Sequence, residues 1–226
     1  MTLFKLLPNS FGKLGTMKAL IRFFSLSLAA ATLAGSAAFA KTPTDAMGAD
    51  LWGEALAAKS FHHEQVKNDD MMIVIDYSRH SSEPRFFLVD MNTMQAESFL
   101  VSHGRNSDLD HDGIADAFSN VSGSKMTSLG TYVTAETYYG KHGLSLRLDG
   151  LDEENSRARE RAIVIHGADY VTPTRTKMGR SWGCPALERA VAERLIPEIA
   201  NGVLIYVRGD TPNQQFASAG KSRGSR

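Results

Sequence analysis

The sequence predicts a mainly β protein, a sandwich or barrel with a few short helices. Short runs rich in Ile, Val, Phe and Leu recur along the chain, and clusters of Gly, Asn, Asp and Pro separate them. Only two segments show the 3.6-residue spacing of apolar residues that is typical of a helix. Many short strands with few helices favour a mainly antiparallel sheet over a doubly wound fold with alternating strands and helices.

The expected elements begin with a short helix from Thr44 to about Ala58. Thr44 is its N-cap, and Ala46, Leu51 and Leu56 are among its apolar positions. Seven strands are expected after it, at Met71–Tyr77, Arg85–Met91, Ser98–Ser102, Thr131–Tyr138, Leu144–Leu148, Ala162–Ile165 and Val203–Val207.

Residues 1–40 have the pattern of a secretion signal. The segment holds four basic residues, and no acidic residue occurs before Asp45. An apolar stretch over 23–38 leads to Ala38-Phe39-Ala40, a small-x-small cleavage site that would leave Lys41 as the new N-terminus. The alternative is a retained membrane anchor, but the stretch is shorter than the ~20 residues of a spanning helix. Translation could also begin at Met17, which is followed directly by the basic residue Lys18.

Cleavage would leave 186 of the 226 residues, enough for one domain with a proper core. The mature chain would carry a net charge near −4, because all four basic residues of the signal are lost and no acidic ones. This charge gives no reason to expect nucleic acid or anionic lipid as a partner. We therefore expect a monomer that meets a membrane only through its export signal.

The single cysteine, Cys184, lies in the segment Arg180-Ser181-Trp182-Gly183-Cys184-Pro185. A lone cysteine in an exported protein is an intermolecular bridge, a small buried hydrophobe or a working thiol. Its polar and glycine neighbours favour the working thiol. A helix expected from Pro185 to about Leu195 would place the thiol near a helix N-terminus, which lowers its pKa. Arg180 adds positive charge nearby, and Gly183 and its neighbours could offer N–H groups to an oxyanion.

A cysteine nucleophile also needs a base, and three histidines come before a glycine. His166 follows the apolar run 162–165, and His103 follows the run 99–102 in the same way, whereas His142 sits in a polar turn. A lone histidine at a strand end is more often structural than catalytic. Nearness in sequence to Cys184 favours His166, but these patterns alone leave His103 as a second candidate.

Three segments together resemble the L,D-transpeptidase catalytic domain of the YkuD type, and most closely its murein L,D-transpeptidase branch. They are Met126–Tyr132, Ile165-His166-Gly167 and Ser181-Trp182-Gly183-Cys184. The resemblance covers the chain from about Met71 to Val207. Trp182 stands where the wider family has a histidine, which is the main departure from the family pattern.

The resemblance implies an L,D-transpeptidase-like β-sandwich or barrel, with a catalytic domain over 71–208. The predicted helix makes 41–70 a helical lead-in, and the polar, small-residue composition of 209–226 predicts a flexible tail. The resemblance makes Cys184 the nucleophile and His166 the general base, and leaves His103 as a second-shell candidate. It implies a substrate or oxyanion-site role for Arg180, Ser181, Trp182, Gly183 and Tyr132.

The resemblance also implies a function. The thiolate of Cys184 attacks a peptidoglycan stem peptide and expels a terminal D-amino acid, and an amine of another stem resolves the thioester into a cross-link. Neither a metal nor an organic cofactor is expected. Two alternatives stay open. One is an L,D-carboxypeptidase or hydrolase, in which water resolves the same thioester. The other is a non-catalytic, calcium-stabilised wall-binding module. A papain-like or NlpC-type peptidase fits poorly, since no histidine follows Cys184.

An acidic loop, Asp108-Leu109-Asp110-His111-Asp112-Gly113, reproduces the beginning of a calcium-binding loop. Ser119 occupies the position where an EF-hand has its bidentate Glu, so a shorter extracellular calcium loop is the better analogy. The alternative is an ordinary solvated turn rich in Asp and Gly. Calcium here would support the loop and take no part in catalysis.

Overall fold

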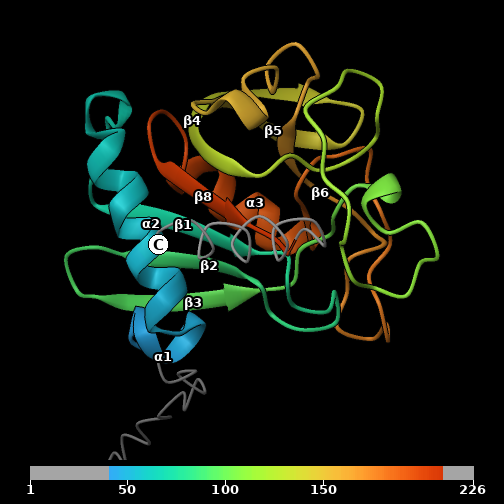
Figure 1. Cartoon of the computed structure of the whole chain (residues 1–226), viewed down its shortest axis with the longest axis horizontal. Coiled ribbons are helices and arrows are strands. Elements are labelled where there is room, and N and C mark those ends of the chain that lie inside the picture. Colours follow the sequence, from blue (N-terminus) through green and yellow to red (C-terminus); the bar gives the residue numbers. More distant parts are fainter. Residues whose placement is uncertain (1–40, 211–226) are drawn as a thin grey trace, which may run out of the picture. The chain divides into compact units, whose positions relative to one another are not determined.

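The computed structural model describes residues 41–210 and has an eight-stranded sheet as its centre. The strand order is β3-β2-β1-β8-β4-β5-β6-β7, and the sheet curves into a nearly closed barrel (Figure 1). Five of the seven strand pairs are antiparallel, while β1–β8 and β6–β7 are parallel. The strand bounds are β1 Met71–Asp76, β2 Phe86–Asp90, β3 Gln95–Phe99, β4 Gly130–Gly140, β5 Gly143–Gly150, β6 Val164–Gly167, β7 Ala186–Leu187 and β8 Leu204–Arg208. The predicted mainly β class is confirmed.

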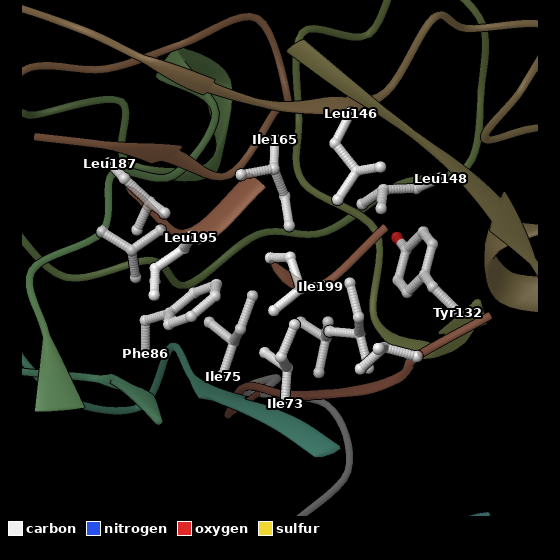
Figure 2. Packing of buried hydrophobic residues seen from close by; sticks show 14 of the residues in the cluster. Ile73, Ile75, Phe86, Tyr132, Leu146, Leu148, Ile165, Leu187, Leu195 and Ile199 are labelled. Atoms are coloured by element: carbon white, nitrogen blue, oxygen red, sulfur yellow. The ribbon is translucent and has the colours of Figure 1, made fainter. Parts of the chain in front are cut away.

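The central strand β1 is buried on both faces. Its side chains alternate, so Ile73 and Ile75 enter the main core, and Met72 and Val74 enter a second core on the opposite face. The main core lies inside the curve of the sheet, where side chains from β1, β2, β4, β5 and β6 converge with those of the last helix (Figure 2). Packing on both faces therefore stabilises the sheet.

Two helices at the start of the described chain cover the outer face of β1 and β2. They are α1, Pro43–Met47, and α2, Ala49–Phe61. The single helix predicted from Thr44 to Ala58 is therefore wrong in detail, because Gly48 at φ +90° breaks it. The N-cap is Thr42, whose hydroxyl accepts the N–H of Asp45, and not Thr44. Leu51, Trp52 and Ala55 of α2 pack into the second core.

The last helix, α3, spans Arg189–Glu198, and the predicted start at Pro185 is wrong. Ala186 and Leu187 form β7 and pair with β6, so the chain is extended where the helix was expected. Leu187 is fully buried by this pairing. Leu187, Val191 and Leu195 are spaced four residues apart, which is why the segment looked helical from Leu187 onward. Cys184 consequently does not lie at a helix N-terminus.

The remaining elements are short. Three 3₁₀ turns span His63–Gln65, Arg105–Ser107 and Glu153–Asn155. The third strand ends at Phe99, three residues before its predicted end, and Ser102 instead makes an isolated bridge to Ala186. Within residues 41–210 no helix has the length and apolar character needed to cross a membrane. The predicted signal (1–40) and residues 211–226 of the predicted tail lie outside the described residues.

Candidate active site

The parallel pair β6–β7 brings the cysteine and histidine segments together. His166 pairs with Ala186 and Gly167 with Leu187, which places Cys184 two residues before the partner of His166. Two isolated bridges add a third segment, since Ser102 pairs with Ala186 and Gly104 with Ser181. His103, between these bridges, therefore lies beneath the cysteine loop. The segments that carry Cys184, His166 and His103 therefore meet at this edge of the sheet.

The loop before the nucleophile is a tight turn closed by Ser181. Its hydroxyl accepts the N–H of Gly183 at 3.0 Å and donates to O of Cys184 at 2.6 Å. Gly183 has φ +118°, and a Cβ there would lie 2.7 Å from O of Met126, so only glycine fits. The N–H of Gly183 is thus occupied within the turn. The N–H of Cys184 has no acceptor among the described residues, so it is free to donate to a bound group.

The thiol of Cys184 is half-buried, and its Sγ lies 3.7 Å from O of Ala162. Burial raises the pKa of the thiol from its ordinary value, while the N–H of Val164 and the charges of Arg161 and Lys141 act in the opposite direction. The net shift is upward. The sequence-based expectation of a lowered pKa depended on a helix N-terminus that is not there. At rest the group is a thiol and not a thiolate.

The imidazole of His166 is buried, and its tautomer follows from one contact. Nδ1 lies 3.0 Å from O of Gly167, and because a carbonyl only accepts, Nδ1 carries the proton and Nε2 keeps its lone pair. Burial is the main cause that lowers the pKa of His166 to about 4; His142, Arg189 and Lys141 act in the same direction, and the hydrogen bond to O of Gly167 acts against them. The pair is therefore neutral at rest. No hydrogen bond between Sγ of Cys184 and Nε2 of His166 is formed in the described structure. Hydrogen bonds between a nucleophile and its base often tighten only when a substrate is bound.

His103 is fully committed to its neighbours. The guanidinium of Arg85 donates to its Nδ1 at 2.8 Å, so Nε2 carries the proton and donates to Asp108 at 3.0 Å. Burial and the charge of Arg85 lower its pKa to about 3. Its only lone pair is occupied, and it has no free nitrogen with which to take a proton from Cys184. Its backbone O accepts the N–H of Ser181, so it supports the cysteine loop from below.

The other predicted site residues occupy different positions. Arg180 donates to O of Arg105 and of Asp108 and so holds the loop on one side. Tyr132 is buried in the core, where its hydroxyl contacts Ser128, and it lies beneath the loop and not on an open cleft wall. Trp182 is 65 % exposed, so the indole is the most solvent-accessible predicted group.

Three further residues act on the site: Arg161 and Lys141 were not singled out from the sequence, and His142 was considered only as a weaker candidate base. Arg161 donates to the loop over residues 119–128 and to Ser128, and its charge favours the thiolate of Cys184. Lys141 and His142 form the two-residue turn between β4 and β5. The ring of His142 stacks on His166, with centroids 4.2 Å apart and planes 22° from parallel. The glycine after His142 gave a signal, but no pattern revealed the stack.

The acidic loop is closed by its own hydrogen bonds. Oxygens of Asp108, Asp110 and Asp112 lie within 4.8 Å of one another, a spacing at which they could bind a metal ion. The carboxylate of Asp108 is buried and accepts the N–H groups of Asp112 and Gly113 besides the imidazole of His103. The loop is thereby joined to the residue that supports the cysteine turn. Calcium binding stays a prediction.

A curved, mainly antiparallel sheet thus brings the segment of Cys184 next to the strand that carries His166. The family model for the L,D-transpeptidase catalytic domain matches residues 45–208. The chain belongs to this family, and the family resemblance seen in the sequence is confirmed. A comparison with curated proteins finds no significant match.

Solved structures of the same family are similar to the chain at low sequence identity. An L,D-transpeptidase from Mycobacterium smegmatis is 12% identical, with a TM-score of 0.41 over 62% of this chain and 59% of that one. L,D-transpeptidase 3 from Mycobacterium tuberculosis is 14% identical, with a TM-score of 0.42 over 62% and 61%. The chain thus spans about 60% of the length of these structures. The family assignment rests on the family model.

Proposed function

We propose that this protein is an exported cysteine acyltransferase that cross-links peptidoglycan stem peptides through a thioester on Cys184. One observation carries the proposal. The imidazole of His166, with the lone pair of Nε2 free, lies on β6, and the thiol and the backbone N–H of Cys184 lie two residues before the β7 residue that pairs with it. These are the nucleophile, base and oxyanion donor that acyl transfer requires. Membership in a family that acts on stem peptides supports the choice of substrate.

In the first step the thiol is deprotonated as it attacks. Nε2 of His166 takes the proton while Sγ of Cys184 bonds to the carbonyl carbon of the diamino acid in the donor stem. The N–H of Cys184 stabilises the oxyanion. The imidazolium then gives its proton to the leaving amine, the peptide bond breaks, and a terminal D-amino acid departs. The product is a thioester, so the energy of the peptide bond is conserved.

In the second step an amine of a neighbouring stem attacks the thioester. His166 takes a proton from this amine and returns it to the sulfur as the C–S bond breaks, which restores the neutral pair. Water in place of the amine would give hydrolysis, and the first half of the reaction would be unchanged. The acceptor therefore decides between transpeptidase and carboxypeptidase activity.

Incubation of the mature protein with purified disaccharide-tetrapeptide, followed by mass spectrometry, tests the proposal. A cross-linked dimer that has lost one D-amino acid supports transpeptidation. A tripeptide product with no dimer would replace it by hydrolysis. If no product forms from the tetrapeptide and the thiol is unreactive, the proposed enzyme activity is refuted and a wall-binding module is the alternative. A matched Cys184→Ala sample controls for contaminating enzymes.

Export is part of the same proposal. The basic residues, the apolar stretch and the small-x-small site of residues 1–40 support a cleavable signal. Peptidoglycan lies outside the cytoplasm, so the proposed substrate and the proposed location agree. N-terminal sequencing of the secreted protein should begin at Lys41; a protein that retains residues 23–38 would instead be anchored.

A further inference from the structure

Two lysines flank the exposed indole beside the nucleophile. The ammonium of Lys125 lies 4.8 Å from the centroid of the Trp182 ring, and that of Lys141 lies 5.5 Å from it. Both distances are within the range of cation–π attraction. Within residues 41–210 neither ammonium makes an ion pair or a side-chain hydrogen bond. Two positive charges therefore lie against the ring of Trp182, and neither has a counterion among the described residues.

The position of these charges limits what they bind. The C-terminal residue that the donor loses carries its carboxylate three bonds beyond the scissile carbonyl carbon, within about 4 Å of it. A cation that recognises this carboxylate must therefore lie close to Sγ of Cys184. The two cations whose charge acts on this sulfur are Arg161 and Lys141.

Only one of these two cations is free to bind a ligand. The guanidinium of Arg161 is half-buried and donates to four acceptors of the neighbouring loop, which are Ser119 O, Ser124 Oγ, Met126 O and Ser128 Oγ. Lys141 is exposed at the tip of the β4–β5 hairpin.

We propose that Trp182, Lys125 and Lys141 form a subsite that binds the C-terminal carboxylate of the donor peptide. Lys141 contacts the carboxylate, Trp182 holds the ammonium in place and gives the terminal residue an apolar floor, and Lys125 adds a second positive charge. The inference rests on the proposed function and names the feature of the donor that the site selects. It also gives a role to the tryptophan that replaces the family histidine.

Binding to the Cys184→Ala protein tests the subsite without turnover. The probes are the stem tetrapeptide with a free C-terminal carboxylate and the same peptide with a C-terminal amide, titrated by calorimetry. We expect the amide to bind about tenfold more weakly, the size of one charge-assisted hydrogen bond at a partly exposed site. Adding Lys141→Gln should weaken the acid about tenfold and abolish the preference over the amide.

Matched variants complete the test. Lys67→Gln removes an exposed lysine that packs against Gly202, and it should leave both affinities unchanged. Trp182→Ala should reduce the preference for the acid, and Trp182→Phe should keep most of it. Equal binding of acid and amide, an undiminished preference in Lys141→Gln, or no measurable binding of the acid at millimolar concentration would overturn the subsite.

The subsite and the proposed function fail in different ways. If the wild type forms no product from the tetrapeptide but Cys184→Ala prefers the acid through Lys141, the subsite stands and the transpeptidase proposal falls. If the wild type makes cross-links at the same rate from acid and amide donors, and Lys141→Gln does not change KM for the acid, the function stands and the subsite falls.

Discussion

Replacing His166 and His103 in turn separates a base from a buried support. The resting pair consists of a thiol whose pKa burial raises from its ordinary 9.0 and an imidazole of pKa about 4. Both shifts oppose proton transfer from Cys184 to His166, so forming the ion pair before the attack is unfavourable. The proton must therefore move during the attack itself, and no other group identified in the site can accept it. We expect His166→Ala to lower the acylation rate by about 10²–10⁴-fold.

His103→Ala should act on stability instead. The substitution removes one acceptor from the buried guanidinium of Arg85 and one donor from the buried carboxylate of Asp108, and it leaves a cavity. Two charge-assisted hydrogen bonds and the cavity are worth roughly 3–5 kcal/mol. For a domain of this size that corresponds to a melting temperature lower by about 10 °C.

The assay measures both quantities on the same preparations. Single-turnover acylation of Cys184, followed by intact mass, gives the rate per folded molecule at a temperature where all variants are folded. Thermal unfolding gives the stability. A rate loss larger in His103→Ala than in His166→Ala would mean that the wrong histidine has been assigned. An unchanged melting temperature in His103→Ala would refute the buried network.

Four other perturbations have defined outcomes. Cys184→Ala should keep the fold, lose all turnover and lose the single covalent adduct that a carbapenem is expected to form; an adduct in this variant would contradict the assignment. EDTA should leave activity intact unless calcium holds the acidic loop, in which case EDTA and Asp110→Ala should lower activity and melting temperature together. The pKa of His166 is about 4 in the folded protein and 6.5 in the unfolded chain, so the unfolded chain binds more protons between these two values. Lowering the pH from 6.5 to 4 should therefore reduce the free energy of unfolding by about 3 kcal/mol through this residue. His166→Phe should lack this part of the loss. His142→Ala should raise the acid limb of the rate profile toward neutral pH, whereas His142→Phe, which keeps the stacked ring, should shift it less.

The fold class and the two candidate histidines at strand ends were predictable because they depend on local patterns. Runs of β-branched and aromatic residues mark buried strands, and a buried strand that ends in His-Gly delivers its histidine to the sheet edge. The start of α3 was not predictable in this way. Leu187 is a strand residue only because β6 pairs with it, and pairing between segments 20 residues apart leaves no periodic signal.

The chemistry of the pair was predicted less well than its identity. A proline after the cysteine favoured a helix and a stabilised thiolate, whereas the structure has an extended chain and a buried thiol. The choice between His166 and His103 needed the contacts of each ring nitrogen, which the sequence does not contain. The stack of His142 and the charge of Lys141 come from a hairpin turn whose position beside the site is set by the curvature of the sheet.

A thiol that stays protonated at rest has a consequence for the lifetime of the protein. Peroxide, disulfides and other oxidants react with the thiolate, so burial that raises the pKa of Cys184 also slows its oxidation. In the oxidising compartment to which the proposed export leads, this lone cysteine has no disulfide partner within the chain. The sulfur of Cys184 would therefore stay unreactive until a substrate binds. The resting enzyme would react more slowly with oxidants and would stay active for longer.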